Sequence, residues 1–291
     1  MTGMPGPRDT DPPDGSPMGT TGLLEELHRL PVRQGTSVRV LQLLDDPDVS
    51  VEEVARHIEA DPALSTRVLR LANSPFFARS GSEASAARAV FLLGLSVVRS
   101  LAVATAAGLF DARSKHLPPG FWDHAIAVAA GATVLARYLD VDRGDAFSAG
   151  VLHDIGEALV CRHAPTEYAE ILRQLRVRPE ERIAAEQAFL QGLSHADVGA
   201  IALQGWRMPE RLVVAVRDHH DPVGRDADAL TRAVVAGDAI ADRLLDDPTP
   251  HHTTADLAAT LVAAGVQASE HDDVVAAVAA ETDQLRASLG C

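Results

Sequence analysis

The sequence has few cysteines and few basic residues. Only two cysteines occur among 291 residues, Cys161 inside an apolar run and Cys291 at the last position. They provide neither a disulfide framework nor the paired spacing of a cysteine metal site. Lysine and arginine total 26 against 41 acidic residues, which gives a net charge of −15. Because phosphate binding depends mainly on clustered lysine and arginine, we do not expect a nucleic-acid partner.

Long apolar runs are also scarce. No segment reaches the roughly 18 to 20 uninterrupted apolar residues of a membrane helix. The N-terminus lacks the basic and then apolar pattern of a signal peptide. Together with the low cysteine content, this predicts a cytoplasmic protein in a reducing compartment, without a membrane partner.

Alanine, leucine and valine are abundant and occur at helical spacing. The chain is 46% hydrophobic and 23% charged, which is sufficient for one large or two medium cores. Aromatic residues make up only 4%, and almost every periodic segment repeats at about 3.6 residues instead of alternating. The sequence therefore predicts an all-α fold, a multi-helix bundle with an N-terminal helical subdomain.

Changes in composition divide the chain into four expected parts. These are a disordered tail rich in Pro, Gly and Asp (1–20), an N-terminal helical part (21–110), a helical bundle with every strong His/Asp feature (121–246), and C-terminal helices (254–291). A linker with two prolines (111–120) and a loop (246–254) separate the last three. The C-terminal stripe with Leu257, Leu261, Val274 and Val278 could mediate self-association, but we expect it to cap the bundle, because an exposed stripe would promote aggregation.

Local signals mark several helix ends. Ser50 with Glu53 predicts a capping box, and Asp61 followed by Pro62 predicts an N-cap and a first helical residue. The segment 86–110 is expected to form two helices broken near Gly94. In the bundle we expect helices over 121–139, 145–162, 165–175, 179–191, 195–205, 209–220 and 229–246.

The stretch "VLHDIGEALV" (151–160) places an imidazole beside a carboxylate within an apolar run. On a continuous helix over 145–162, His153, Asp154 and Glu157 share one polar arc opposite the apolar face. Taken alone, this pattern predicts a solvated face, and a metal site is the less common alternative.

Two other residues lie on apolar helical stripes. His124 projects toward the interior, where it could be a core histidine with one hydrogen bond. Asp238 shares its stripe with Val234, Ala241 and Leu245. A buried carboxylate is costly unless it pairs with an arginine or binds a cation, and both alternatives stay open.

Three further histidines lie near helix ends. His219 and His220 close the segment "PERLVVAVRDHH", where they could be ligands or caps that compensate the helix dipole. His195 follows Ser194, which forms a capping box with Asp197, so His195 opens a helix either as an exposed first-turn residue or as a ligand.

Together these residues form a much more specific set than any of them alone. The candidate metal ligands are His124, His153, Asp154, His195, His219, His220 and Asp238, with His153 and Asp154 also the candidate catalytic residues. Such donors suit divalent transition metals (Fe, Mn or Zn), and five imidazoles with two carboxylates suffice for one or two ions. No organic cofactor is expected.

The order of these residues resembles the signature of the HD superfamily: a His, a His-Asp pair and a distant Asp. The phrases "ADPALSTRVLRLANSPFF", "FSAGVLHDIG" and "SHADVGAIALQGWRMPERLVVAVRDHHDP" resemble the HDOD domain more specifically, over about 23–245. His195, His219 and His220 match the additional histidines of two-metal HD proteins. The resemblance implies a helical bundle that acts as an output or scaffold module in bacterial signal transduction.

Two departures from the related cyclic di-GMP phosphodiesterases, the HD-GYP proteins, argue against hydrolysis. Those proteins carry a lysine where this chain has Glu157, and an acid there would repel phosphate unless a metal or an arginine offset it. Their Gly-Tyr-Pro turn is also absent after His220.

We therefore expect a non-enzymatic signalling module that binds metal, has a protein partner and is able to form homo-oligomers. The alternative function is a metal-dependent phosphohydrolase. A DNA-binding regulator is disfavoured, because the chain is acidic and lacks a basic recognition helix.

Overall fold

The computed structural model describes residues 36–77, 85–108, 117–175, 181–221, 226–245 and 256–289. Within these ranges every regular element is a helix, which confirms the predicted all-α fold. The predicted tail (1–20), the first part of the linker at 111–120 and the loop at 246–254 lie outside the described residues.

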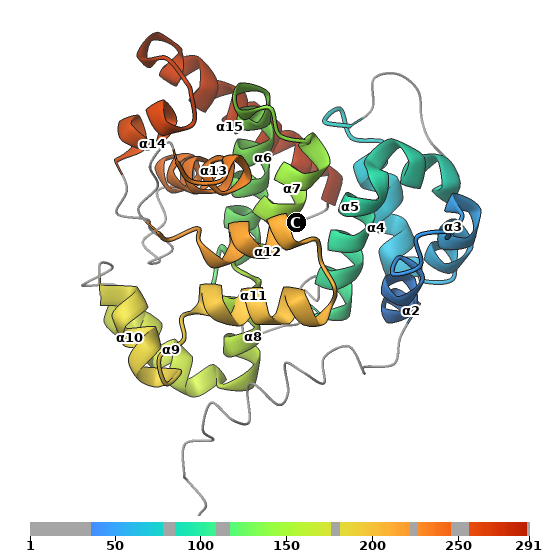
Figure 1. Ribbon diagram of the computed structural model, residues 1–291, viewed down its shortest axis with the longest axis horizontal. Helices are drawn as coiled ribbons and strands as arrows, with labels where there is room; N and C mark the ends of the chain where they lie inside the picture. The colour runs from blue at the N-terminus through green and yellow to red at the C-terminus, as the bar shows by residue number, and fades with distance from the viewer. Residues whose placement is uncertain are drawn as a thin grey trace, which may run out of the picture.

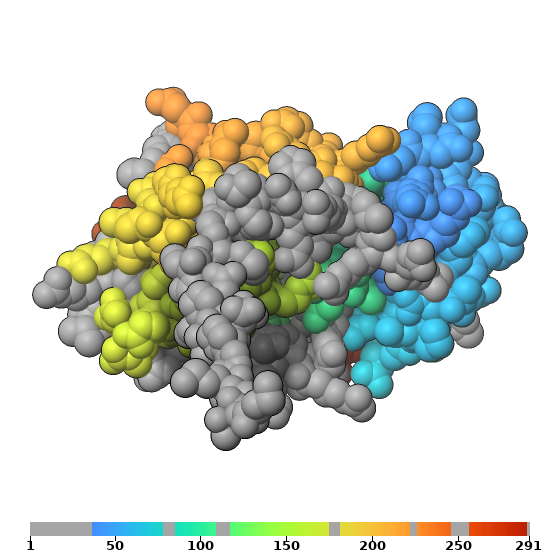
Figure 2. Space-filling model, turned by 90° about the horizontal axis from the view of Figure 1, so that it is seen from below, coloured from blue at the N-terminus to red at the C-terminus, as the bar shows by residue number. Residues whose placement is uncertain are grey.

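The described helices fall into three groups along the chain. The N-terminal helices are α2 (Thr36–Leu43), α3 (Val51–Glu59), α4 (Pro62–Ala72) and α5 (Ala86–Ala106). The central helices are α6 (Phe121–Leu139), α7 (Arg143–Leu152), α8 (Ile155–His163), α9 (Pro165–Leu175), α10 (Arg182–Phe189), α11 (His195–Gly205), α12 (Glu210–Arg217) and α13 (Ala229–Leu245). The last are α14 (Leu257–Ala263), the 3-10 turn η3 (Ala268–Glu270) and α15 (His271–Leu289). Helices α2 to α4 gather at one end of the molecule (Figure 1), and α9 and α10 lie at the opposite end (Figure 2).

The predicted helix signals act as expected. The Asp61 side chain accepts hydrogen bonds at the start of α4, with Pro62 as the first helical residue. Of the capping box predicted for Ser50 and Glu53, the structure shows the half in which Ser50 accepts a hydrogen bond from the Glu53 backbone. Ser194 forms a complete capping box with Asp197. Helix α5 is kinked at Gly94, whose backbone is non-helical with φ 78° and ψ 159°.

Helix α5 is the one described helix that could cross a membrane by length and composition, with a mean hydropathy of 1.9. The criterion of an uninterrupted run does not select it, because Arg88 and Arg99 interrupt the apolar sequence. In the structure, 56% of its apolar window is buried, and it packs against α2, α3, α4 and α7. Helix α5 is therefore a core helix of the bundle.

The centre of the bundle is the closely packed pair α6 and α13. A Cβ added at Gly131 would lie 2.7 Å from the Cα of Gly237, so this crossing requires glycine. Helix α6 also packs against α15, which buries Val274, Val278 and Leu285. The apolar stripe expected to cap the bundle is thus covered within the chain.

The continuous helix predicted over 145–162 is wrong. Helix α7 ends at Leu152 and α8 begins at Ile155, because the two halves pack on different partners, α7 on α6 and α8 on α11. The junction removes His153 and Asp154 from the predicted solvated arc and buries them, with 1% and 3% of their surface exposed. Glu157, expected on the same arc, is also fully buried.

Candidate metal centre

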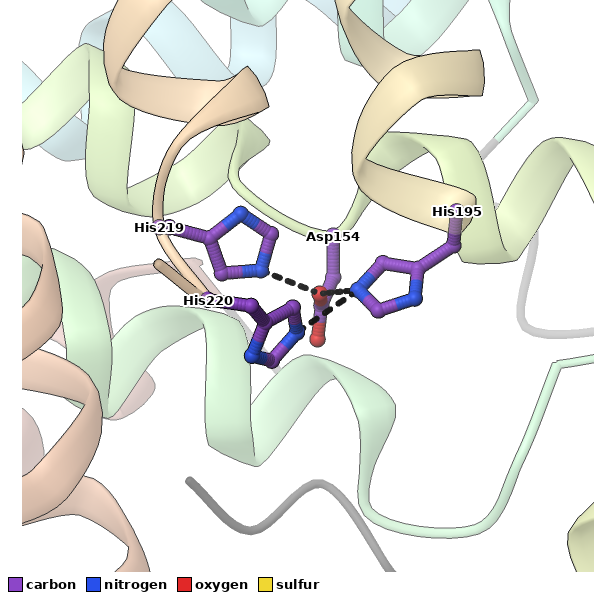
Figure 3. Close-up of side chains that lie close together, drawn as sticks. All are labelled: Asp154, His195, His219 and His220. Atoms are coloured by element: carbon purple, nitrogen blue, oxygen red, sulfur yellow. Dashed lines mark hydrogen bonds and ion pairs between the residues drawn. The ribbon is translucent and has the colours of Figure 1, made fainter. Parts of the chain in front are cut away.

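Four donor side chains from three segments, one aspartate and three histidines, lie close together (Figure 3). The ligand atoms of Asp154, His195, His219 and His220 all lie within 4.8 Å of one another. Asp154 Oδ1 lies 3.2 Å from His195 Nε2 and 3.4 Å from His219 Nε2. His220 Nε2 lies 2.9 Å from His195 Nε2. We call these residues the Asp154 group.

A second group lies directly beside it and consists of His124, His153 and Asp238. His124 Nε2 lies 3.2 Å from His153 Nε2 and 3.1 Å from Asp238 Oδ1. The other oxygen of Asp154, Oδ2, lies 3.1 Å from His153 Nε2. We call this second set the Asp238 group. Asp154 therefore has one carboxylate oxygen in each group, as a bridging ligand between two ions would.

All seven residues proposed from the sequence thus meet in one place. His124, His153, Asp154, His195, His219 and Asp238 are buried, and His220 is partly exposed. The alternative of an exposed first-turn residue is therefore wrong for His195. Among the described residues, the ion-pair partner of Asp238 is His124 and not an arginine.

Close packing brings the segments together. A Cβ added at Gly156, two residues after Asp154, would lie 1.9 Å from the carbonyl oxygen of His195. Only glycine allows α8 and the start of α11 to approach so closely. Gly237, directly before Asp238, lies at the close crossing of α6 and α13. This crossing brings Asp238 to within 3.1 Å of His124 of α6.

Hydrogen bonds at Nδ1 orient three of the imidazoles. His153 Nδ1 donates to the Gly150 carbonyl at 2.8 Å, and His219 Nδ1 donates to the Val216 carbonyl at 2.6 Å. Because a carbonyl oxygen only accepts, the proton lies on Nδ1 and the Nε2 lone pair faces the centre. His195 Nδ1 lies 2.6 Å from the Glu186 carboxylate, which has the same effect. Metal-ligating histidines in proteins are oriented in this way.

The pKa is raised for two histidines of the centre and lowered for two others. Burial opposes a charge on His195, but the carboxylate of Glu186 outweighs it and raises the pKa to about 9. Burial also opposes a charge on His153, where Asp154 raises the pKa. In contrast, burial lowers the pKa of His219, and burial and the neighbouring His219 lower the pKa of His220 well below its usual value.

The two carboxylates are ionised despite their burial. His153 holds the pKa of Asp154 well below its usual value, and the hydrogen bond from His124 lowers the pKa of Asp238. Two anionic carboxylates among imidazoles form a donor set that fits a divalent transition metal. Cation binding would displace protons from His195 and His153, because only neutral imidazole is a ligand.

A buried polar cluster lies behind His195, and sequence reasoning singled out only one of its members, Glu157. The cluster consists of Glu157, Tyr168, Arg182 and Glu186, all at most 3% exposed. Arg182 lies between the two acids, with Nη2 3.1 Å from Glu157 and Nε 3.0 Å from Glu186. Arg182 and Glu186 are four residues apart, a spacing that suits an ion pair on one helix face, but nothing in the sequence marks this pair as buried.

An all-helical bundle that brings a His, a His-Asp pair and a distant Asp to one buried centre has the architecture of an HD-type protein. The chain belongs to the HDOD domain family, whose family model matches residues 30–222. This confirms the resemblance inferred from the sequence.

Several solved structures share the fold, and one sequence relative matches most of this chain. A Shewanella amazonensis protein whose name suggests a phosphohydrolase is 27% identical, with a TM-score of 0.69 over 92% of this chain and 97% of that protein. A Geobacter sulfurreducens HDOD domain protein of unknown function is 24% identical, with a TM-score of 0.65 over 92% and 96%, and shares the fold. An uncharacterised Treponema pallidum protein is 24% identical over 79% of this chain, and the chain spans only 45% of that relative.

Proposed function

We propose that this chain is an HDOD-type output or scaffold protein of signal transduction whose buried centre binds one or two divalent transition metal ions (Fe, Mn or Zn). The proposal of metal binding rests on the convergence of the seven donors, among which Asp154 is shared between the two groups. Metal occupancy would bias the arrangement of the helices that supply the ligands, and a protein partner would detect this arrangement.

Burial of the centre supports a signalling role over hydrolysis. Of the seven donors, only His220 is partly exposed, so a substrate larger than a small ion would reach the metals only if helices moved. The cationic side chain of Arg182, which contacts Glu157, is held between two acids. It is therefore poorly placed to bind a phosphate ester. A fold relative from Marinobacter aquaeolei carries a name that suggests signal transduction.

An apolar surface supports a protein partner. Helix α5 exposes Phe91 by 83% and Leu95 by 45% beside the Gly94 kink. Exposed large apolar side chains that lie together are typical of protein contact sites. We propose a protein signalling partner here, in the cytoplasm, and a homo-oligomer as an alternative occupant.

One observation favours a second candidate, a metal-dependent phosphohydrolase. The two donor groups adjoin at the Asp154 carboxylate, an arrangement that suits two ions activating a water against a phosphate ester. His124, His153, Asp154 and Asp238 would hold one ion, and His195, His219 and His220 would complete a second. The Shewanella amazonensis relative named for phosphohydrolase activity supports this alternative.

Metal loading combined with a substrate screen separates the two candidates. Protein purified without chelator is loaded with Mn²⁺, Fe²⁺ or Zn²⁺ and assayed on phosphate monoesters, diesters and cyclic dinucleotides. The signalling proposal expects bound metal without turnover. Turnover by the two-metal form that is abolished in Asp154→Ala would overturn it in favour of the phosphohydrolase.

A further inference from the structure

The Glu186 carboxylate makes two contacts to His195 through one oxygen. Its Oε2 lies 2.6 Å from the ring Nδ1 of His195 and accepts a hydrogen bond of 2.9 Å from the backbone N–H of the same residue. One oxygen thus holds both the ring and the first backbone position of α11. The ring can no longer rotate about χ2 without losing a charge-assisted hydrogen bond.

The other oxygen of Glu186 is held from a different direction. Tyr168 donates its hydroxyl hydrogen to Oε1 at 2.6 Å, and Arg182 Nε donates to the same atom at 3.0 Å. Arg182 in turn contacts Glu157, on the helix that begins just after Asp154. Contacts from α9, α10 and α11 therefore fix the Glu186 carboxylate in one orientation.

The direction of the ring makes this arrangement more than a buried ion pair. With Nδ1 directed at Glu186, the opposite nitrogen of His195 lies 3.2 Å from Asp154 Oδ1 and 2.9 Å from His220 Nε2. A ring turned over would direct carbon atoms at these ligands. Carboxylates behind ligating histidines fix the tautomer and raise the basicity of the ligand.

We propose that Glu186 is a positioning residue of the metal centre, which keeps the proton of His195 on Nδ1 and directs Nε2 at Asp154, with Tyr168 and Arg182 holding Glu186 in place. The inference rests on the proposed metal binding. It assigns a role to helices α9 and α10, which supply no ligand themselves.

The direct test is Glu186→Gln, which keeps the shape and removes the charge. We expect Zn²⁺ and Mn²⁺ affinity, measured by calorimetry, to fall by about 10- to 100-fold. Tyr168→Phe removes one support of Glu186 and leaves its contact with His195, so its loss should be smaller. The matched control is Glu170→Gln, which removes an exposed carboxylate of α9 that pairs with Arg173; its metal affinity should equal that of the wild type.

A second readout does not depend on metal binding. The hydrogen bond of 2.6 Å should shift the Nδ1 proton of His195 far downfield in the NMR spectrum, in a signal assigned by its absence from His195→Gln. We expect this signal in the wild type and in Glu170→Gln, and its loss in Glu186→Gln. Circular dichroism and thermal unfolding verify that each variant is folded at the temperature of measurement.

The outcomes distinguish this inference from the proposed function. A wild type that shows the signal and binds no metal contradicts the proposed function, and with it the metal-directed role of Glu186. If the wild type binds metal and folded Glu186→Gln keeps both its affinity and the downfield signal, the inference is wrong while the proposed function stands.

Discussion

Asp154 differs from the other donors because its two oxygens face different groups. Asp154→Asn should therefore weaken metal binding at both groups, whereas Asp238→Asn should weaken only the group with His124 and His153. Calorimetric titration with Zn²⁺ measures the number of sites and their affinities. Asp283→Asn, an exposed change on α15, is the control and should bind as the wild type does. An Asp154→Asn protein with wild-type binding would show that this carboxylate is not a ligand.

The pair His195 and Glu186 predicts a pH dependence of stability in the presence of chelator. The pKa of His195 is raised from 6.5 to about 9, so its stabilising effect is complete below pH 6.5 and is lost as pH rises through 9. The pKa of Glu186 is lowered, so its effect is lost only as pH falls below its usual value of 4.5.

Urea unfolding should therefore show a free energy of unfolding that falls between pH 6.5 and pH 9. In Glu186→Gln the decline over this range should be shallower, because the charge that raises the pKa of His195 is gone. Equal slopes for the two proteins would contradict the assigned ion pair.

The candidate metal ligands could be found from the sequence, but the buried residues that position them could not. His124 and Asp238 stood out because they are polar residues on apolar stripes, and His153-Asp154 because the pair interrupts an apolar run. Glu186 and Arg182 lie on a helix with polar residues on several sides, and Tyr168 lies on another helix. Their meeting depends on tertiary packing that no local spacing encodes.

At the scale of elements, the approach of α8 to α11 gives a sharp prediction. Gly156→Ala should destabilise the protein and weaken the Asp154 group, because the added Cβ would lie 1.9 Å from the His195 carbonyl oxygen. Gly205→Ala, on α11, is the matched control, because a Cβ there meets no atom within 4 Å. Thermal unfolding and Zn²⁺ titration compare the two variants. A Gly156→Ala protein as stable as the control would contradict the close approach.

Arg182 of α10 pairs with a buried acid of its own helix, Glu186, and with a buried acid of α8, Glu157. Arg182→Met should lower the free energy of unfolding by about 3–5 kcal/mol, since it removes the guanidinium that lies between two buried carboxylates, Glu157 and Glu186. Arg173→Met breaks an exposed pair on α9 and should change stability far less, because solvent screens exposed ion pairs. Urea unfolding measures both. A loss for Arg182→Met no larger than that for Arg173→Met would refute the buried network.

Helix ends were predictable where a local signal marks them. The bounds of α6, α9 and α11 agree with the sequence prediction, and a proline or a capping box marks the start of α9 and α11. The break between α7 and α8 has no such signal. Apolar spacing continues across His153 and Asp154, and only the different packing partners of the two helices separate them.

At the scale of the whole molecule, the centre joins segments that are far apart in the sequence. Its ligands come from α6, the α7–α8 junction, the start of α11, the turn after α12 and the middle of α13. The N-terminal helices pack on this bundle through α5, which contacts α7. Arg99 of α5 donates hydrogen bonds both to Asp45 of the N-terminal part, at 2.9 Å, and to the Trp206 carbonyl of the bundle, at 3.5 Å. A ligand that binds the centre therefore acts on most of the bundle at once.

The metal content of the purified protein tests the central claim most directly. The wild type, produced with Fe, Mn and Zn in the medium and purified without chelator, is analysed by plasma mass spectrometry beside Asp154→Asn. We predict one or two transition metal ions per wild-type chain and far fewer in the variant. A wild type that carries no metal, and takes up none when dialysed against Mn²⁺ or Zn²⁺, would contradict the account.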